Sequence, residues 1–309
     1  MANDGRPRYR NIVADSARWE GFEFRDGDIV ISTPPKCGTT WMQMICALLI
    51  FQTPTFDRTL DLISPWLDMQ TRDRASVIAD LDAQVHRRFI KSHTPFDGLP
   101  YSELATYICV GRDPRDVGFS WDNHMANLDL ATFIGAREAA VGLDDLAELM
   151  PDGPSVVPDS ELERFRLWME ADETPLRGPG GLLATLHHLT TFWEARQRPN
   201  VVLVRYEDLK ADLEAAMRSL AARLGIEVDE ADWPTLVDAA TFNRMRERAD
   251  EIVPDSSHDI WQDNRQFFHR GSCGQWRDVL PPTDIDRYHV RVAELADPEL
   301  AAWLHGGTG

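Results

Sequence analysis

Residues 28–51 read D-I-V-I-S-T-P-P-K-C-G-T-T-W-M-Q-M-I-C-A-L-L-I-F, and this stretch decides the fold. An apolar run rich in β-branched residues ends at two prolines, a K-C-G-T-T turn follows at 36–40, and a strongly apolar segment comes next. This order predicts a buried strand, a tight loop and a buried helix. Because unpaired N–H groups at a helix N-terminus carry partial positive charge, the loop suits an anion. Lys36 adds a full charge and Thr39 and Thr40 add hydroxyl donors, so we expect a ligand that bears phosphate or sulfate.

The turn differs from the phosphate-binding loop of nucleotide kinases. That loop reads G-x-x-x-x-G-K-[ST], with the lysine after the second glycine. Here Lys36 precedes Gly38, and two prolines stand where the earlier glycines would be. The loop is shorter and its lysine enters from the strand side, which favours a relative of these kinases with a different chemistry.

The composition is that of a globular protein with an acidic surface. The chain has 309 residues, of which 43% are hydrophobic and 27% charged, and its net charge is −19. No uncharged apolar run reaches about 18 residues and the N-terminus has no apolar leader, so we expect a cytoplasmic protein without a transmembrane segment. The negative charge argues against nucleic acid and anionic membranes as partners. An anionic ligand is still compatible, because surface charges are screened beyond about 8 Å at physiological salt.

The four cysteines, at positions 37, 46, 109 and 273, match neither a zinc site nor a disulfide framework, and we expect no metal. Cys37 allows two interpretations. A thiol at a helix N-terminus beside a lysine would have a depressed pKa. Alternatively, Cys37 is a small side chain that only fills space, and we favour this second interpretation.

Short β-like runs alternate with helical ones, which is typical of βαβ units around a parallel sheet. We therefore predict an α/β fold: a single P-loop-like three-layer domain over residues 1–309, with a central, mostly parallel sheet flanked by helices. The expected strands are Ile29–Thr33, Arg88–Lys91, Thr106–Gly111 and Asn200–Arg205. The expected helices are Thr39–Phe51, Arg72–Ala83, Pro114–Asn127, Leu143–Leu149, Leu182–Arg196, Asp212–Leu224, Glu230–Ala239, Phe242–Arg248 and Thr283–Ala296.

Residues 127–181 show poor periodicity and contain P-D-G-P at 151–154 and R-G-P-G-G at 177–181. Two interpretations are open. The segment is an insertion that forms a lid or a wall on the acceptor side, or it is a solvated surface excursion.

Residues 88–95, R-F-I-K-S-H-T-P, place Lys91 and His93 two positions apart, so that both side chains leave the expected strand on the same face. The carboxyl end of such a strand is where α/β proteins bind ligands. A histidine there suits a general base at neutral pH, and a neighbouring lysine would keep it neutral. A capped surface histidine is the alternative, and the adjoining lysine favours the base.

Residues 106–120, T-Y-I-C-V-G-R-D-P-R-D-V-G-F-S, combine a strand end with a helix start, where Asp113 caps the helix. Arg112 offers a planar fork for phosphate oxygens, and Ser120 adds a hydroxyl about two turns into the helix. We interpret Arg115 and Asp116 as part of a solvated helix face.

Residues 267–276, F-F-H-R-G-S-C-G-Q-W, form a basic loop with two glycines. Such a loop lets consecutive N–H groups converge on an anion. Arg270 and Gly271 are therefore candidate phosphate ligands.

These segments resemble, in order, the motifs of the cytosolic-type sulfotransferases, which use 3′-phosphoadenosine 5′-phosphosulfate (PAPS). T-P-P-K-C-G-T-T-W at 33–41 resembles T-x-P-K-S-G-T-T-W, and K-S-H-T-P at 91–95 resembles K-[ST]-H-x-P. The third segment resembles R-[ND]-x-[KR]-D-x-x-x-S. The fourth resembles R-K-G-x-x-G-x-W, with His269 and Gln275 as departures.

The resemblance implies a role for each matching residue. The loop residues around the 5′-phosphosulfate are Lys36, Cys37, Gly38, Thr39, Thr40 and Trp41. Arg112 and Ser120 would bind the 3′-phosphate, with Arg270 and Gly271 beside them. Tyr206, Phe242 and Trp41 would surround the adenine, although each of these aromatic residues also suits an ordinary core.

The resemblance also implies in-line transfer of a sulfuryl group without a metal, with catalysis by positioning and charge. His93 would deprotonate the acceptor hydroxyl, Lys91 would support the sulfuryl oxygens, and Lys36 would stabilise the departing PAP. Ser120 would hold Lys36 aside until an acceptor arrives. The alternatives are a nucleotide kinase and a non-catalytic PAP-binding sensor.

The acceptor is expected to be an apolar or amphiphilic alcohol, phenol or glycolipid, and the sequence ranks none of these. No dimerisation pattern follows Trp276, so the oligomeric state is open. The candidate wall residues on the acceptor side are Trp66, Leu67, Phe96, Trp121, His124, Met125, Phe133 and Trp168.

Overall fold

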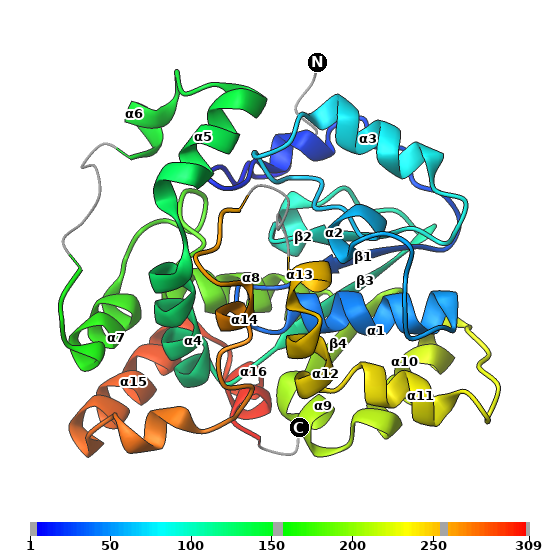
Figure 1. The fold of residues 1–309 in the computed structure, drawn as a ribbon. Helices are drawn as coiled ribbons and strands as arrows, with labels where there is room; N and C mark the ends of the chain where they lie inside the picture. The colour runs from blue at the N-terminus through cyan, green and yellow to red at the C-terminus, as the bar shows by residue number, and fades with distance from the viewer. Residues whose placement is uncertain (1–4, 151–156, 254–258, 307–309) are drawn as a thin grey trace.

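The computed structural model describes residues 5–150, 157–253 and 259–306, and its centre is a four-stranded sheet (Figure 1). All the strand pairs are parallel and the order is β2-β1-β3-β4. Val30 of the central strand lies opposite Ile90 on one side and Tyr107 on the other. The strands are β1 Asp28–Ser32, β2 Phe89–Ser92, β3 Ala105–Gly111 and β4 Val201–Arg205.

One face of the sheet packs on a core built around α1. This helix is apolar on nearly all sides because it lies between the sheet and further helices. The helices that contribute to this core are α1 Thr39–Phe51, α2 Leu60–Ile63, α9 Tyr206–Ala211, α10 Leu213–Leu224, α11 Trp233–Ala239, α12 Phe242–Glu247 and α13 Ala249–Ile252, with α14 Asn264–Phe267 at its margin.

The opposite face carries a second core, in which Val30, Ile90 and Tyr107 of the sheet are fully buried. The helices that pack there are α3 Arg74–Ala83, α4 Pro114–Asn127, α7 Glu161–Glu170, α8 Leu182–Glu194, α15 Pro282–Leu295 and α16 Pro298–Leu304. The three-layer α/β fold with a parallel central sheet is therefore confirmed.

The segment 127–181 contains more regular structure than its sequence indicates. It includes α5 Leu130–Val141 and α7, besides the short α6 Leu146–Leu149. In Figure 1, α5 and α6 lie at the upper left, away from the sheet. The P-D-G-P motif at 151–154 lies outside the described residues. Within the described residues, no helix is long and apolar enough to cross a membrane.

A buried ion pair joins the start of β1 to the start of β2. Arg88 Nε lies 2.9 Å and Nη2 2.5 Å from the two carboxylate oxygens of Asp28. Both side chains are 1% exposed. Because a buried charge without its partner is costly, this pair is expected to fix the register of the two strands.

We predict that Asp28→Ala lowers the free energy of unfolding by about 3 kcal/mol, because the buried Arg88 guanidinium loses its buried countercharge and keeps only the exposed Asp82, 3.5 Å from Nη1. Urea unfolding followed by circular dichroism measures this change. The control is Glu230→Ala, which breaks an exposed pair with Arg218 and should have little effect. Equal effects of the two substitutions would contradict the prediction.

Candidate functional site

A cavity of about 400 Å³ lies at the carboxyl ends of the strands. Its wall includes Lys36 after β1, His93 after β2, Arg112 after β3 and Tyr206 after β4. The chain therefore brings the segments singled out in the sequence to one place. The predicted site residues that line the cavity are Lys36, Gly38, Thr39, Thr40, Trp41, Lys91, His93, Arg112, Ser120, Tyr206, Phe242, Arg270 and Gly271.

Cys37 is the exception among the predicted site residues. Its side chain is fully buried in the second core, and its N–H group donates to the carbonyl of Pro34 at 3.3 Å. Burial raises the pKa of the Cys37 thiol to about 12. A depressed pKa is therefore wrong, and Cys37 serves as a small core residue.

The loop after β1 has an unusual backbone. Lys36 has a φ of 69°, which is rare for a residue with a side chain, and Gly38 has a φ of 110°. A Cβ atom at Gly38 would lie 3.0 Å from the Tyr206 ring. The turn therefore requires glycine at this position, both for its conformation and for its close contact with Tyr206.

Lys36 points into the cavity beside other cations. Its Nζ lies 3.3 Å from His124 Nδ1 and 4.5 Å from the centre of the Phe267 ring. Burial, and then the charges of Arg112 and Lys91, lower the pKa of Lys36 to about 7. The hydrogen bond formed by this amine in the structure is with His124 and not with Ser120.

His93 has the geometry of a base. Its Nδ1 lies 2.6 Å from the carbonyl of Thr33, so Nδ1–H donates and Nε2 is left as the acceptor. Burial, and then the charge of Lys91, hold the pKa of His93 well below its usual value. The ring packs against Trp66, with centroids 4.7 Å apart. His93 is therefore neutral near pH 7, as expected beside a lysine.

Asp68 supports this histidine, and the sequence motifs do not reveal it. It is fully buried and accepts hydrogen bonds from Ser92 Oγ at 2.5 Å and Thr94 Oγ1 at 2.6 Å, the residues on either side of His93. Trp19 Nε1 donates a third bond at 3.2 Å. Burial raises the pKa of Asp68, while these bonds favour its charged form.

Arg112 joins the first loop to the last one. Nη1 donates to the carbonyl of Lys36 and Nη2 to the carbonyl of Ser272, each at 3.1 Å. The guanidinium lies 4.4 Å from the centre of the Tyr206 ring. Its Nε is buried without a hydrogen-bond partner among the described residues, which suits a group that receives an anionic ligand.

Arg115 and Asp116 are not on a solvated helix face, which corrects the prediction. Asp116 is fully buried, and its carboxylate accepts the N–H groups of Gly274 at 2.6 Å and Gln275 at 3.0 Å. Arg115 is also buried and lies 3.7 Å from the centre of the Trp276 ring. The two side chains therefore attach the late glycine loop to α4.

Aromatic rings form another part of the wall. A Cβ atom at Gly271 would lie 2.3 Å from the Phe242 ring, so only glycine allows this contact. Trp41 packs edge-on against Tyr206, with centroids 5.2 Å apart, and donates Nε1–H to the carbonyl of Ala240 at 2.8 Å. These rings line the cavity next to the cations.

The acceptor-side prediction is partly wrong. Trp66, Trp121, His124, Met125 and Phe133 line the cavity, but Leu67, Phe96 and Trp168 are absent from its wall. These three side chains pack in or against the second core instead. The cavity wall also includes apolar residues that the sequence analysis did not predict: Ile12, Val13, Leu128, Ile260 and Trp261.

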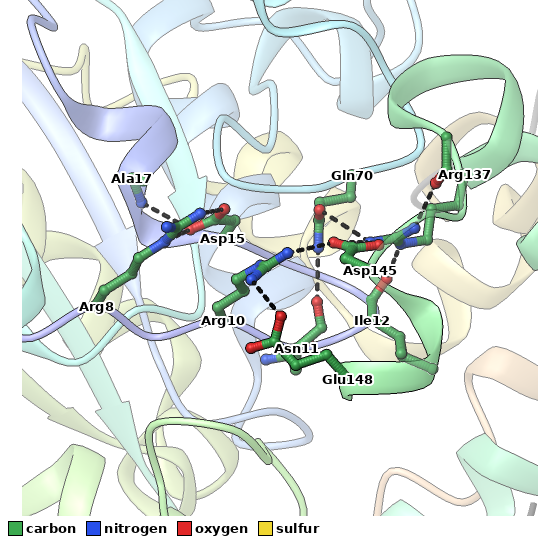
Figure 2. A network of polar contacts seen from close by, with 11 residues as sticks. Arg8, Arg10, Asn11, Ile12, Asp15, Ala17, Gln70, Arg137, Asp145 and Glu148 are labelled. Atoms are coloured by element: carbon green, nitrogen blue, oxygen red, sulfur yellow. Dashed lines mark hydrogen bonds and ion pairs between the residues drawn. The ribbon is translucent and has the colours of Figure 1, made fainter. Parts of the chain in front are cut away.

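Ile12 and Val13 belong to an N-terminal segment that is held by a polar network (Figure 2). Asp145, at the start of α6, lies 2.6 Å from Arg10 Nη2 and 2.8 Å from Arg137 Nη2. Arg137 of α5 is fully buried and also donates to the carbonyl of Ile12 at 3.1 Å. Partial burial raises the pKa of Asp145, but the hydrogen bonds from Arg10 and Arg137 outweigh this effect, so that the pKa is lowered overall.

The arrangement can bind an anion and remove a proton. Five lysine and arginine side chains and two glycine-containing loops line the same cavity as a neutral imidazole whose Nε2 is left as the acceptor. The five side chains are Lys36, Lys91, Arg112, Arg177 and Arg270. In the described part of the chain, no group of three His, Cys, Asp or Glu side chains could hold a metal ion.

Residues 26–298 match the model of the sulfotransferase domain. The chain belongs to the sulfotransferase family. A glycolipid sulfotransferase of Mycobacterium bovis is 41% identical over 307 residues, which cover 97% of this sulfotransferase and 94% of the relative. An amine sulfotransferase of Oryctolagus cuniculus is 25% identical, covering 87% and 80% of the two chains.

Solved structures share the fold of this sulfotransferase. A mouse sulfotransferase complexed with PAP aligns over 94% of this chain and 92% of its own, with a TM-score of 0.67 and 19% identity. Retinol dehydratase in complex with androsterone and PAP aligns over 92% and 86%, with a TM-score of 0.68 and 19% identity.

We predict that Asp145→Asn speeds amide exchange in residues 9–14 by about tenfold, because the charge that attracts Arg10 and Arg137 is lost. Hydrogen–deuterium exchange with mass spectrometry measures this. Glu148→Gln is the control, since Glu148 is more exposed and contacts Arg10 at 3.4 Å. Unchanged exchange in the Asp145 variant would show that the network does not hold the segment.

Proposed function

We propose that this sulfotransferase transfers the sulfuryl group of PAPS to a hydroxyl of a glycolipid or similar amphiphilic alcohol. The observation that carries the proposal is the common cavity of Lys36, Arg112 and Arg270 with the neutral His93. Cations bind the donor, and the imidazole accepts the proton that the acceptor loses.

The residues present fit PAPS, which would supply the activated sulfuryl group. The loop at Lys36, Gly38, Thr39 and Thr40 offers a cation, N–H groups and hydroxyls to the 5′ end of the donor. Arg112, Ser120, Arg270 and Gly271 would hold the 3′-phosphate, supported by the unpaired Nε of Arg112. Trp41, Tyr206 and Phe242 would pack against the adenine.

Each catalytic side chain has a separate task in this proposal. His93 accepts the proton of the acceptor hydroxyl at Nε2, since its Nδ1–H is engaged with Thr33. Lys36 supplies positive charge to the leaving PAP, and Lys91 faces the sulfuryl oxygens. Lys91 Nζ also lies 3.9 Å from the centre of the Trp66 ring, which fixes its position.

The acceptor side supports a lipid-like substrate. A small cluster of apolar side chains lies apart from the two main cores, with Met69, Phe133 and Ile260 at its centre. All three line the cavity. A large apolar wall near a catalytic base suits an amphiphile whose hydroxyl is its polar end. The 41% identical glycolipid sulfotransferase agrees with this class, so we place the lipid part of the acceptor here.

Two alternatives remain distinguishable by experiment. A nucleotide kinase would hydrolyse or transfer from Mg-ATP, and a PAP sensor would bind PAP without turnover. A thermal-shift comparison of PAP with ATP, followed by turnover of labelled PAPS with a library of lipid alcohols, separates the three functions. Binding of PAP with no turnover of any acceptor would favour the sensor.

We predict that His93→Ala lowers turnover by about 10²–10⁴-fold, because the acceptor hydroxyl loses its base. The affinity for PAP should change by less than about twofold, since in the proposed reaction His93 acts on the acceptor hydroxyl and not on PAP. Sulfuryl transfer assays and calorimetry measure the two quantities. His289→Ala, an exposed substitution on α15, is the control. Turnover near the wild-type rate would mean that another group is the base.

We predict that Asp116→Asn weakens PAP binding by about tenfold, because one of the two loop N–H groups loses its acceptor and the late glycine loop loosens. Calorimetric titration with PAP measures this. Asp122→Asn is a matched control on the same helix, since Asp122 pairs with Arg164 and not with the loop. Equal affinities in both variants would contradict the role of Asp116.

A further inference from the structure

Lys36 is hydrogen-bonded to a histidine that the proposed reaction does not use. His124, near the end of α4, places Nδ1 3.3 Å from Lys36 Nζ. A protonated lysine has three donors and no acceptor, so His124 Nδ1 must accept this bond. The imidazole proton of His124 is then on Nε2.

Aromatic rings fix both partners of this bond. The His124 ring centroid lies 4.7 Å from that of Trp261 and 5.8 Å from that of Phe267. Phe267 also lies under the amine, with its ring centre 4.5 Å from Lys36 Nζ. The negative face of an aromatic ring attracts an ammonium group without neutralising it. Lys36 is thus held between an imidazole acceptor and an aromatic face.

We propose that His124 is a positioning residue, which fixes the Lys36 ammonium in the cavity and favours its protonated form. This inference rests on the proposed function, because it assumes that Lys36 must carry a charge to stabilise the leaving group. The two imidazoles of the cavity then have opposite roles. In His93, Nδ1 donates and Nε2 accepts, whereas in His124, Nδ1 accepts and Nε2 donates.

The surroundings of Lys36 explain why such a partner is needed. Burial and neighbouring cations lower the pKa of Lys36 to about 7, so part of the amine would be uncharged near neutral pH. A neutral hydrogen-bond acceptor beside the amine opposes this loss of the proton. His124 is such an acceptor, because burial, and then the charge of Lys36, hold the pKa of His124 well below its usual value. The titratable and charged groups that face Lys36 are Lys91, His93, Arg112, His124 and His269.

The first test measures the pKa of Lys36 without using activity. The rate at which acetic anhydride labels Lys36 is followed against pH by mass spectrometry. His124→Leu removes the acceptor, and should lower the Lys36 pKa by about one pH unit, the value of a hydrogen bond to a charged group. His124→Asn keeps an oxygen near the place of Nδ1 and should restore most of the shift.

The control for this labelling is His289→Leu, at an exposed position on α15, which should leave the Lys36 pKa unchanged. An unchanged or raised Lys36 pKa in His124→Leu would overturn the inference. If that variant does not fold, ¹⁵N NMR of the wild-type protein decides, since the inference requires an unprotonated Nδ1 in His124. A protonated Nδ1 would contradict it.

The second test uses the pH profile of kcat/KM with PAPS. Loss of the His124 contact should move the basic limb to lower pH, because Lys36 loses its proton earlier, and His124→Asn should move it back. A purely structural role would lower the rate equally at every pH and would overturn the inference. If wild-type protein transfers no sulfuryl group, the proposed function fails, while labelling still decides the His124–Lys36 contact.

Discussion

The candidate site depends on the contacts that the Arg112 guanidinium makes. The guanidinium reaches the carbonyls of Lys36 and Ser272 with two separate nitrogens and stacks on the ring of Tyr206. One side chain thus joins the loop after β1, the late glycine loop and the start of α9. A planar fork with several donors can make all three contacts at once, which the single ammonium of a lysine cannot. The shape of this part of the cavity wall therefore depends on one residue, directly after β3.

The site gathers cations in a protein whose net charge is −19, and aromatic rings make this possible. A carboxylate beside each cation would neutralise the charge that a ligand needs. A ring face attracts the cation, excludes water and leaves the charge available. The cation–ring pairs at the cavity are Lys36 with Phe267, Lys91 with Trp66 and Arg112 with Tyr206.

Local signals made α1 and α4 predictable to the residue. Asp113 caps α4 and Pro114 occupies its first position, so that two adjacent residues indicate where this helix begins. In α5 the buried positions are Phe133 and Arg137, too few to give an apolar stripe. The start of α7 carries a capping signal, Ser160 followed by Glu163, but the residues around it show poor periodicity. The role of Asp116 was hidden because its partner, Gly274, is 158 residues away.

The apolar cluster around Met69, Phe133 and Ile260 is separate from both cores that pack on the sheet. Substitutions in this cluster change the shape of the cavity, while the packing that holds the strands together stays intact. If the acceptor is the amphiphile proposed above, natural selection can exchange one acceptor for another here without rebuilding the fold. The loops that we propose to bind the donor have no such freedom, since they directly follow the strands.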